Sequence, residues 1–448
     1  MSQSLEELTH ALMFAAKKAG ADAVDAMAVK GTALSIDVRN GVLEQAERSE
    51  GIDIGLRVFT NGRQACVSSS NTSEQTIEAM CERAIAMARE APEDPYAGLA
   101  DPDQLADMRS AEGLELCDPT PEPDPAMLQE DAMRAEEAAL GKTGISQVQS
   151  ASAGYSAREI HIATSNGFSG GYQRTDRAVS CVAIGGTGAQ MERDYDGDSR
   201  IFQADLRDAA DIGATAAERA LARMGARKPP TGSYPVLFDE RISTTIVGHL
   251  LAAINGASIA RGSSWLRDAL GAQIMPEHLS IIEDPHRVRV PGSRYFDAEG
   301  LPTQKRAIVQ NGILTGWTLD LANGRKLDMP STANAARGTS APPSPSSWNI
   351  AITQGSKSRD ELARDMGTGL LVTSMIGSTI NATTGDYSRG AAGFWIENGE
   401  ITHPVNECTI AGNLRDMLMH MTPANDARSY LSRVVPSLLI EGMTLAGN

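Results

Sequence analysis

Two short segments carry residue types that occur in hydrolase and nucleotide sites. Gly167-Phe168-Ser169-Gly170-Gly171 fits the pattern Gly-x-Ser-x-Gly, in which a strand, a strained turn and a helix expose a nucleophilic serine. Here Asn166-Gly167 is typical of a turn, and the residues from Tyr172 onward are typical of a strand. The segment therefore predicts a hairpin tip in place of a nucleophile.

The second segment, Gly141-Lys142-Thr143, resembles the end of a phosphate-binding loop. That motif requires a glycine five positions before Gly141, where this chain has Glu136 within a predicted helix. A carboxylate at that place would repel phosphate, so we predict no nucleotide site. No Gly-x-Gly-x-x-Gly motif follows a predicted strand either.

The histidines are the remaining candidates for metal ligands. A peptidase zinc helix carries two histidines about one turn apart with a glutamate beside the first, and no two histidines here have that spacing. His403, Glu407 and Cys408 lie close in sequence, but a strand would direct Glu407 and Cys408 to opposite faces, and Pro404 opposes a helix. We interpret this segment as a turn entering a strand. The motifs thus assign no catalytic, cofactor-binding or metal-ligating residue.

The elements that would position functional groups begin with a helix, a meander and a second helix. Ser4 and Glu7 form a capping box, and Gly20 ends the first helix. Period-two alternation with Asn-Gly pairs predicts antiparallel strands joined by tight turns. The predicted strands lie at 34–39 and 52–58, the turns at 40–41 and 61–62, and a helix opened by a capping box at 72–75 runs to about 89.

A Pro- and Asp-rich connector at residues 91–124 precedes a second unit of the same kind. Its predicted helices lie at 126–140 and 206–224, and its predicted strands at 146–153, 159–164 and 178–184. The order helix, strands, helix thus occurs twice, which indicates a repeated architecture.

Lys228-Pro229-Pro230-Thr231-Gly232 marks the clearest boundary of the chain. A strand at 234–238 and a helix at 242–255 follow, and then short strands with Asn-Gly turns at 311–312, 323–324 and 398–399. The predicted fold class is α+β, with N-terminal helix–β-meander–helix units followed by a mostly β C-terminal domain. The predicted domains are residues 1–95, 96–227 and 228–448.

Composition excludes several classes of function. Among 448 residues the formal net charge is −17, and aromatic residues make up 4%, which disfavours binding to nucleic acid or anionic lipid. The most apolar stretch that we find, residues 246–254, is far shorter than the roughly 20 residues of a membrane span. Five scattered cysteines without a Cys-x-x-Cys pair indicate free thiols, and no signal peptide is evident, so we expect a cytoplasmic protein.

The C-terminal part of the sequence resembles PmbA/TldE proteins of the TldD/PmbA family, and the likeness extends over nearly the whole chain. The N-terminal meander around 51–62 also resembles that of the family. The segments that carry the likeness include Gly292-Ser293-Arg294, Phe296-Asp297-Ala298-Glu299-Gly300, Thr384-Gly385-Asp386-Tyr387-Ser388-Arg389-Gly390, Thr409-Ile410-Ala411-Gly412-Asn413-Leu414-Arg415-Asp416 and Pro436-Ser437-Leu438-Leu439-Ile440-Glu441-Gly442.

The resemblance implies a cytosolic metallopeptidase in which a TldD-like and a PmbA/TldE-like subunit pair around an enclosed cleft. It implies unfolded peptides as substrates, including leader regions of modified antibacterial peptides and labile antitoxins. In TldD-like subunits a helix carries His-Glu-x-x-x-His and a C-terminal cysteine completes the zinc site. Zinc-bound water would attack the peptide carbonyl, with the glutamate as general base.

The corresponding helix here, around residues 243–254, contains His249 and no carboxylate. Thr244 and Ile254 stand five positions on either side of His249, and neither can replace an imidazole ligand. Cys408 belongs to a strand signature and does not match the context of the metal cysteine. The resemblance therefore implies a non-catalytic subunit that forms the cleft, with zinc held by the partner and none in this chain.

Two alternatives remain open at the level of sequence. One is an independent hydrolase with an unrecognised site, for example one that uses Ser169 or His403. The other is a homo-oligomeric peptide-binding or regulatory protein that self-associates and has no peptidase partner.

Overall fold

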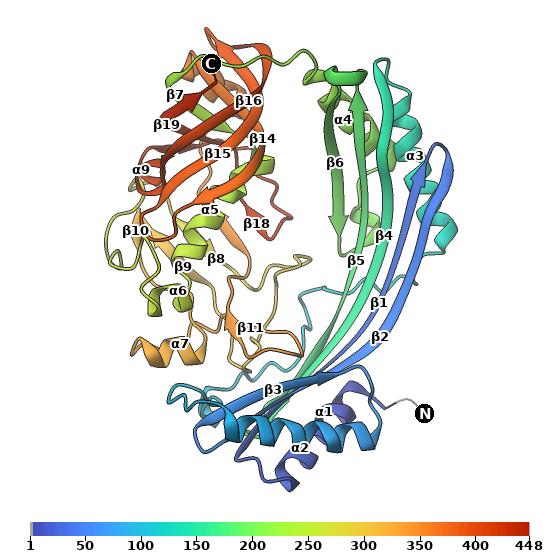
Figure 1. Cartoon of the computed structure of the whole chain (residues 1–448), viewed down its shortest axis with the longest axis vertical. Helices are drawn as coiled ribbons and strands as arrows, with labels where there is room; N and C mark the ends of the chain where they lie inside the picture. Colours follow the sequence, from blue (N-terminus) through green and yellow to red (C-terminus); the bar gives the residue numbers. More distant parts are fainter. Residues whose placement is uncertain (1–2, 448) are drawn as a thin grey trace.

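The computed structural model describes residues 3–447, apart from the side chains of residues 189, 378 and 379. A long, curved antiparallel sheet forms one side of the molecule, and a β-barrel with its loops forms the other (Figure 1). Two helices pack near each end of the long sheet. The predicted α+β class with a strand-rich C-terminal part is confirmed.

The first helix–meander–helix unit has the predicted order of elements, but its strands extend beyond residues 34–39 and 52–58, and the sequence assigned no strand at residues 63–69. It consists of α1 (Leu5–Lys18), β1 (Ala23–Arg39), β2 (Val42–Thr60), β3 (Arg63–Ser69) and α2 (Glu74–Glu90). The Ser4 hydroxyl accepts the Glu7 N–H and the Glu7 carboxylate accepts the Ser4 N–H, so the predicted capping box is confirmed. The predicted start of the second helix, a capping box at 72–75, was wrong by one residue. The Ser73 hydroxyl accepts the Thr76 N–H and begins α2.

The second unit repeats this order with longer strands. It consists of α3 (Pro125–Leu140), β4 (Ile145–Thr164), β5 (Ser169–Gly185), β6 (Glu192–Arg200) and α4 (Ala209–Ala222), with short 3-10 helices at Pro102–Gln104, Gly188–Gln190 and Gln203–Asp205. The two strands predicted at 146–153 and 159–164 are one strand, because Gly154 pairs with Ser35 on one side and Ala178 on the other. Sequence analysis also missed β6, whose Asp194, Asp196 and Asp198 face arginines.

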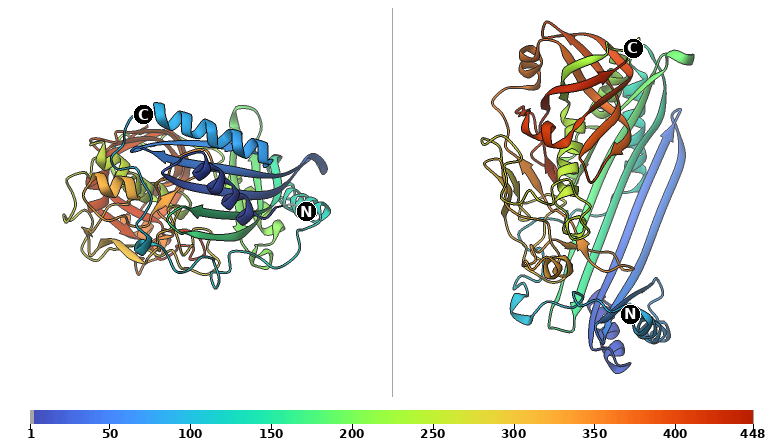
Figure 2. Two further views of the ribbon diagram at one scale, coloured as in Figure 1. Left: turned by 90° about the horizontal axis from the view of Figure 1, so that it is seen from below. Right: turned by 60° about the vertical axis from the view of Figure 1, so that its left-hand side comes forward.

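Both units contribute to one sheet with the strand order β3-β2-β1-β4-β5-β6. The two halves join where β1 pairs with β4, from Asp25 opposite Thr164 to Val38 opposite Ala151. Alternate residues of β1 and β2 are buried under α1 and α2 at one end of the sheet, and alternate residues of β1, β4 and β5 are buried under α3 and α4 at the other. The strands of this sheet run lengthwise along the molecule (Figure 2).

The C-terminal part is a barrel with attached loops. Strands in the order β16-β15-β14-β7-β19-β17 close into a barrel because β16 also pairs with β19. A second sheet has the order β10-β9-β8-β13-β18. The elements are β7 (Gly232–Phe238), α5 (Glu240–Ala253), α6 (Gly256–Ala260), β8 (Ile281–Glu283), β9 (Arg306–Gln310), β10 (Ile313–Leu314), α7 (Leu321–Lys326), β11 (Ala335–Ala336), β12 (Ser344–Pro345), β13 (Ile350–Ile352), α8 (Arg359–Met366), β14 (Gly369–Ile380), β15 (Asp386–Glu397), β16 (Glu400–Asn413), α9 (Leu414–Met419), β17 (Met421–Pro423), β18 (Arg433–Val434) and β19 (Leu438–Ala446).

One predicted turn in this part was wrong. Asn323-Gly324 lies inside the helix α7, because the Asp320 carboxylate accepts the Asn323 N–H and begins a helix there. Asn311 and Asn398 do adopt the left-handed conformation that the Asn-Gly turns require.

Buried charges join the long sheet to the C-terminal part. Asp25 on β1 lies between two guanidinium groups: Arg57 Nε donates to its Oδ2 at 3.0 Å, and Arg337 Nη2 lies 2.7 Å from its Oδ1. All three side chains are at most 5% exposed. Gly55 packs so close to the Thr339 backbone that a Cβ there would lie 2.2 Å from the Thr339 carbonyl oxygen. The segment after β11 is therefore fixed against β1 and β2.

We expect Asp25→Asn to destabilise the protein by about 3–5 kcal/mol, because it leaves two guanidinium groups buried without their shared counter-charge. The change in free energy of unfolding would be measured by urea titration. The control is Asp365→Asn, which removes an exposed pair with Lys357 and should change stability little. Equal effects of the two substitutions would contradict the role given to Asp25.

The environment of Glu299 predicts that the free energy of unfolding depends on pH. Its Oε2 accepts the Leu321 N–H at 2.8 Å. Burial, and then the nearby Asp297, raise the pKa of the Glu299 carboxyl to about 8. The folded chain keeps a proton that the unfolded chain releases above a pKa of about 4.3, so this group lowers stability as pH rises from 5 to 8. Glu299→Gln should flatten that decline in urea titrations. An unchanged slope would show that Glu299 is ionised in the folded protein.

Candidate functional site

The helix α5 lies where the long sheet meets the barrel. Asp239 begins it by accepting the Arg241 N–H, and the apolar residues Ile246, Val247 and Leu250 bury it against the barrel core. Arg241 Nη1 also donates to Asp194 of β6 at 3.0 Å, which connects the start of α5 to the edge of the long sheet. In Figure 1, α5 lies beneath β14 and β15. The helix predicted to correspond to the metal helix of TldD-like subunits thus lies at the junction of the two halves.

His249 is held in a partly apolar environment. Its ring meets the Tyr387 ring edge-on, with centroids 5.9 Å apart. Nε2 is buried and has no hydrogen-bond partner among the described residues. Burial, assisted by the positive charge of Arg389, lowers the pKa of His249, so the ring is neutral near pH 7. These contacts are those of a histidine packed at the edge of the core.

Two arginines give this face of α5 a positive charge. Arg389 on β15 acts electrostatically on His249, and its Nε is buried without a hydrogen-bond partner among the described residues. The Nη1 atom of Arg433 on β18 lies 3.4 Å from where a Cβ on Gly248 would stand. Neither guanidinium forms an ion pair within the described part of the chain. Such groups attract carboxylates and repel metal cations.

The positions that would complete a metal motif on α5 carry no ligands. Leu250, directly after His249, stands where a general base would follow the first histidine, and it is fully buried. Ile254, five positions after His249, is also fully buried, and Thr244, five positions before it, is only partly buried. Across the described residues, no group of three His, Cys, Asp or Glu side chains lies in an arrangement that could hold a metal ion.

His403, Glu407 and Cys408 are not brought together. They lie within β16, which begins at Glu400, so the turn that we predicted at His403 is part of the strand. Glu407 has a positive φ of 50° and its exposed carboxylate lies 3.5 Å from Lys228 Nζ. The Cys408 thiol is buried and donates to the Ala391 carbonyl at 3.2 Å. Burial raises the pKa of this thiol to about 11.

Ser169 lies at the hairpin tip that the sequence predicted. It is the first residue of β5, and a strand follows it, so the strand–turn–helix context of a nucleophile elbow does not occur here. Its hydroxyl nevertheless lies 3.2 Å from Nε2 of His10 and 3.5 Å from Nε2 of His161. The Gly171 N–H donates to the Arg109 carbonyl, so it does not serve a reacting oxyanion. Sequence analysis missed this grouping because its members come from α1, β4 and β5.

The segment Gly141-Lys142-Thr143 follows the end of α3 and has a structural role. Lys142 Nζ donates to Glu218 of α4 at 2.7 Å. The Glu136 carboxylate, which the sequence marked as incompatible with phosphate, accepts the N–H groups of Asn40 and Gly41 at 2.6 and 2.7 Å. It therefore stabilises the β1–β2 turn.

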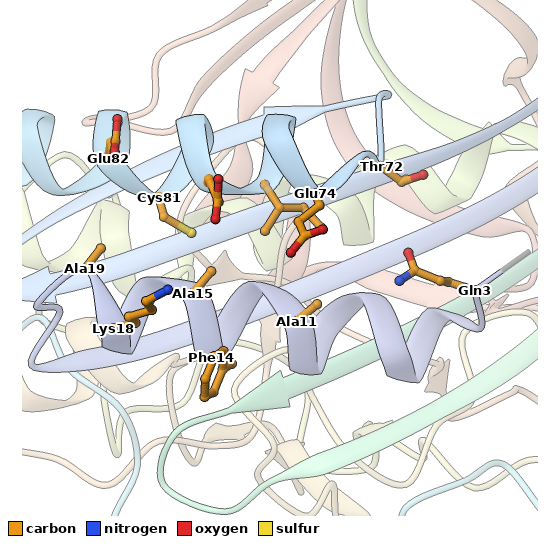
Figure 3. A pocket seen from close by; sticks show the side chains of 12 residues that line it. Gln3, Ala11, Phe14, Ala15, Lys18, Ala19, Thr72, Glu74, Cys81 and Glu82 are labelled. Carbon is orange, nitrogen blue, oxygen red and sulfur yellow. The ribbon is translucent and has the colours of Figure 1, made fainter.

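The surface has one hollow at this junction and another at the far end of the long sheet. One of about 320 Å³ lies at the start of α5, between β6 and the barrel, and is lined by residues that include Asp194, Arg241 and Thr373. Another of about 600 Å³ lies between α1 and α2, where Phe14 is 73% exposed (Figure 3). No helix within residues 3–447 is long and apolar enough to cross a membrane.

We expect His249→Leu to preserve or raise stability, because leucine removes a buried nitrogen that has no partner. The lowered pKa of His249 means that the unfolded ring takes up a proton below about pH 6.5 while the folded ring does not, so wild-type stability falls as pH falls. In urea titrations, the free energy of unfolding of His249→Leu relative to wild type should increase from pH 7 to pH 5. A large loss of stability would contradict this view of His249, and loss of a bound metal would identify it as a ligand.

Comparison with known proteins agrees with this architecture. Three family models match in order: the PmbA/TldA metallopeptidase domain 1 at residues 24–88, the central domain at 118–224 and the C-terminal domain at 231–447. The chain is 38% identical over 445 residues to the metalloprotease PmbA of Escherichia coli O157:H7, which covers 99% of this chain and 96% of that protein.

Solved structures share the fold over nearly the full length. A crystal structure from Bacteroides thetaiotaomicron, of a protein named for a proposed effect on DNA gyrase, has a TM-score of 0.92 at 28% identity and covers 99% of both chains. TldE from Thermococcus kodakarensis has a TM-score of 0.85 at 20% identity and covers 98% of this chain and 100% of its own. With its three domain models and its full-length relative, this chain belongs to the PmbA/TldD metallopeptidase family.

Proposed function

We propose that this chain is the non-catalytic, cleft-forming PmbA/TldE-type subunit of a two-component cytoplasmic peptidase. A TldD-like sibling supplies the zinc, its ligands and the general base, and the pair cleaves or trims unfolded peptides. The observation that carries the proposal is α5, where Leu250 and Ile254 stand at the positions of the general base and the second imidazole that would accompany His249.

The charges around α5 support a role in holding peptides. Arg389 and Arg433 form no ion pair within the described residues, in a chain whose net charge is −17. Guanidinium groups bind carboxylates with two parallel hydrogen bonds, so this face suits acidic side chains or the end of a peptide. It does not suit a metal-bound hydroxide.

Strand edges support the binding of extended peptides. β3 pairs with β2 only from Ile54 to Thr60, so in the described structure the outer edge of β2 from Val42 to Asp53 has no neighbouring strand. A peptide can add to such an edge through backbone hydrogen bonds, which recognise chain conformation more than sequence. This mode fits unfolded substrates of varied sequence.

The experiment is a reconstitution assay with a fluorogenic unfolded peptide. We expect no cleavage by this chain alone and zinc-dependent cleavage when a sibling bearing His-Glu-x-x-x-His is added. The matched control is the sibling with the motif glutamate replaced by glutamine, which should still bind this chain but leave the peptide intact.

Other outcomes would support the alternatives. Cleavage by this chain alone, abolished by Ser169→Ala or His403→Ala, would identify an independent hydrolase. Stable self-association together with failure to bind the sibling would identify a homo-oligomeric binding protein. Either result would overturn the proposal.

A further inference from the structure

A surface groove lies between α1 and α2, at the end of the long sheet away from α3 and α4 (Figure 1). Its volume is about 600 Å³. Ile77 and Cys81 of α2 form part of its floor, and they belong to the core beneath the two helices and are at most 5% exposed. The groove takes no part in the function proposed for α5.

The α1 side of the groove is apolar. An alanine row, Ala11, Ala15 and Ala19, recurs every four residues, and its side chains point toward α2 (Figure 3). Small side chains of this kind let a further helix approach closely. Phe14 also lines the groove and is 73% exposed, whereas the other six phenylalanines of the chain are buried or partly buried. Single exposed apolar residues are ordinary, but an exposed aromatic ring beside an apolar groove is typical of a protein-binding surface.

The α2 side of the groove is acidic. A glutamate row, Glu74, Glu78 and Glu82, has four-residue spacing along one face of α2, and all three residues line the groove. Within the described residues, none of these carboxylates forms an ion pair or accepts a hydrogen bond. Like charges at this spacing destabilise a helix, so the row is unfavourable in the chain by itself. The lining includes one basic side chain, Lys18, so the carboxylates outnumber the cation.

The negative potential extends to the floor of the groove. Burial, and then the charges of Glu78 and Glu82, raise the pKa of the Cys81 thiol to about 11. The thiol therefore stays protonated near pH 7, and it donates to the Leu12 carbonyl at 3.8 Å. A cation placed over this surface would be attracted, and an anion would be repelled.

We propose that this groove binds an amphipathic helix of another protein, with apolar side chains against Phe14 and the alanine row and with lysines or arginines along the glutamate row. Helices dock in grooves through side chains that recur every three to four residues. The two rows, at 11–19 and 74–82, each span about two helical turns and therefore fit a helix of at least that length. The positive charge of the partner would relieve the repulsion within the glutamate row.

Charge disfavours a second copy of this chain as the occupant. A two-fold contact uses the same surface of both copies, so it would bring two glutamate rows into one interface. The net charge of −17 on each copy adds to that repulsion. An anionic lipid surface is disfavoured for the same reason.

The test is fluorescence anisotropy of the full-length chain with a dye-labelled helical peptide of about 18 residues, which has leucine on one face and lysine on the other. We expect Phe14→Ala and Glu78→Lys each to weaken binding about tenfold, because they remove the aromatic contact and reverse the central charge of the row. Both residues are exposed, so the variants should fold, which circular dichroism would check. Added salt should also weaken binding.

The matched controls lie on α3. Met127→Ala truncates a side chain that is 55% exposed, and Glu130→Lys reverses an exposed charge on the same helix. Neither should change the affinity, and a peptide with glutamate in place of lysine should not bind. Hydrogen exchange should show that the leucine–lysine peptide protects amides of α1 and α2.

The inference is overturned if the leucine–lysine peptide does not bind at about 1 mM, where even weak complexes are populated. It is also overturned if Glu130→Lys weakens binding as much as Glu78→Lys, since the peptide would then respond only to the overall charge. Dimerisation of the free chain that Phe14→Ala abolishes would identify a second copy as the occupant and would overturn the choice of partner.

Discussion

The arrangement of the two halves depends on one buried carboxylate. Asp25 pairs with Arg57 of its own sheet and with Arg337 of the segment after β11, and removal of the Asp25 carboxylate would leave both guanidinium groups buried without their shared counter-charge. Burying charges is unfavourable, so the triad is no source of large net stability. Its effect is to make one relative placement of the sheet and the barrel lower in free energy than placements in which the sheet or the barrel is shifted.

That placement determines where α5 lies. The segment fixed by Arg337 continues from Ala335, whose N–H donates to Asp297, so the loops beneath the barrel are tied to the same point of the sheet. At the other end Arg241 ties the start of α5 to Asp194 of β6. The helix with His249 is therefore held at the junction from two directions, with its apolar face against the barrel. In the proposed function, the helix held in this way forms part of the cleft.

The parts of this structure that could be predicted from sequence are those determined within a few residues. The capping box of Ser4 and Glu7 and the turn at Asn40-Gly41 depend on local hydrogen bonds and on the left-handed conformation that Asn and Gly tolerate. The misplaced turn at Asn323-Gly324 shows the limit of that reasoning, because Asp320, three residues earlier, caps a helix through the same dipeptide.

Pairings between distant segments could not be predicted. The single long strand β4 looks interrupted at Gly154 in sequence, and only its neighbours β1 and β5 keep it extended. The closure of the barrel by β16 and β19 joins segments that no local pattern relates. The contacts of His10 with His161 and of Asp25 with Arg337 could not be predicted either, since these residues come together only when the long sheet has formed. For α5 the sequence could predict the absence of a metal motif, because that motif depends only on which residues follow His249 along one helix.

The most direct test of the proposed function is to count zinc in the proposed pair of this chain and a TldD-like sibling. Elemental mass spectrometry should find about one zinc per pair, the stoichiometry of a single dedicated site. That zinc should remain when His249 is replaced by leucine and be lost when the first histidine of the sibling's motif is replaced by glutamine. Loss of zinc on His249→Leu would contradict the account, because it would place the metal on α5 of this chain.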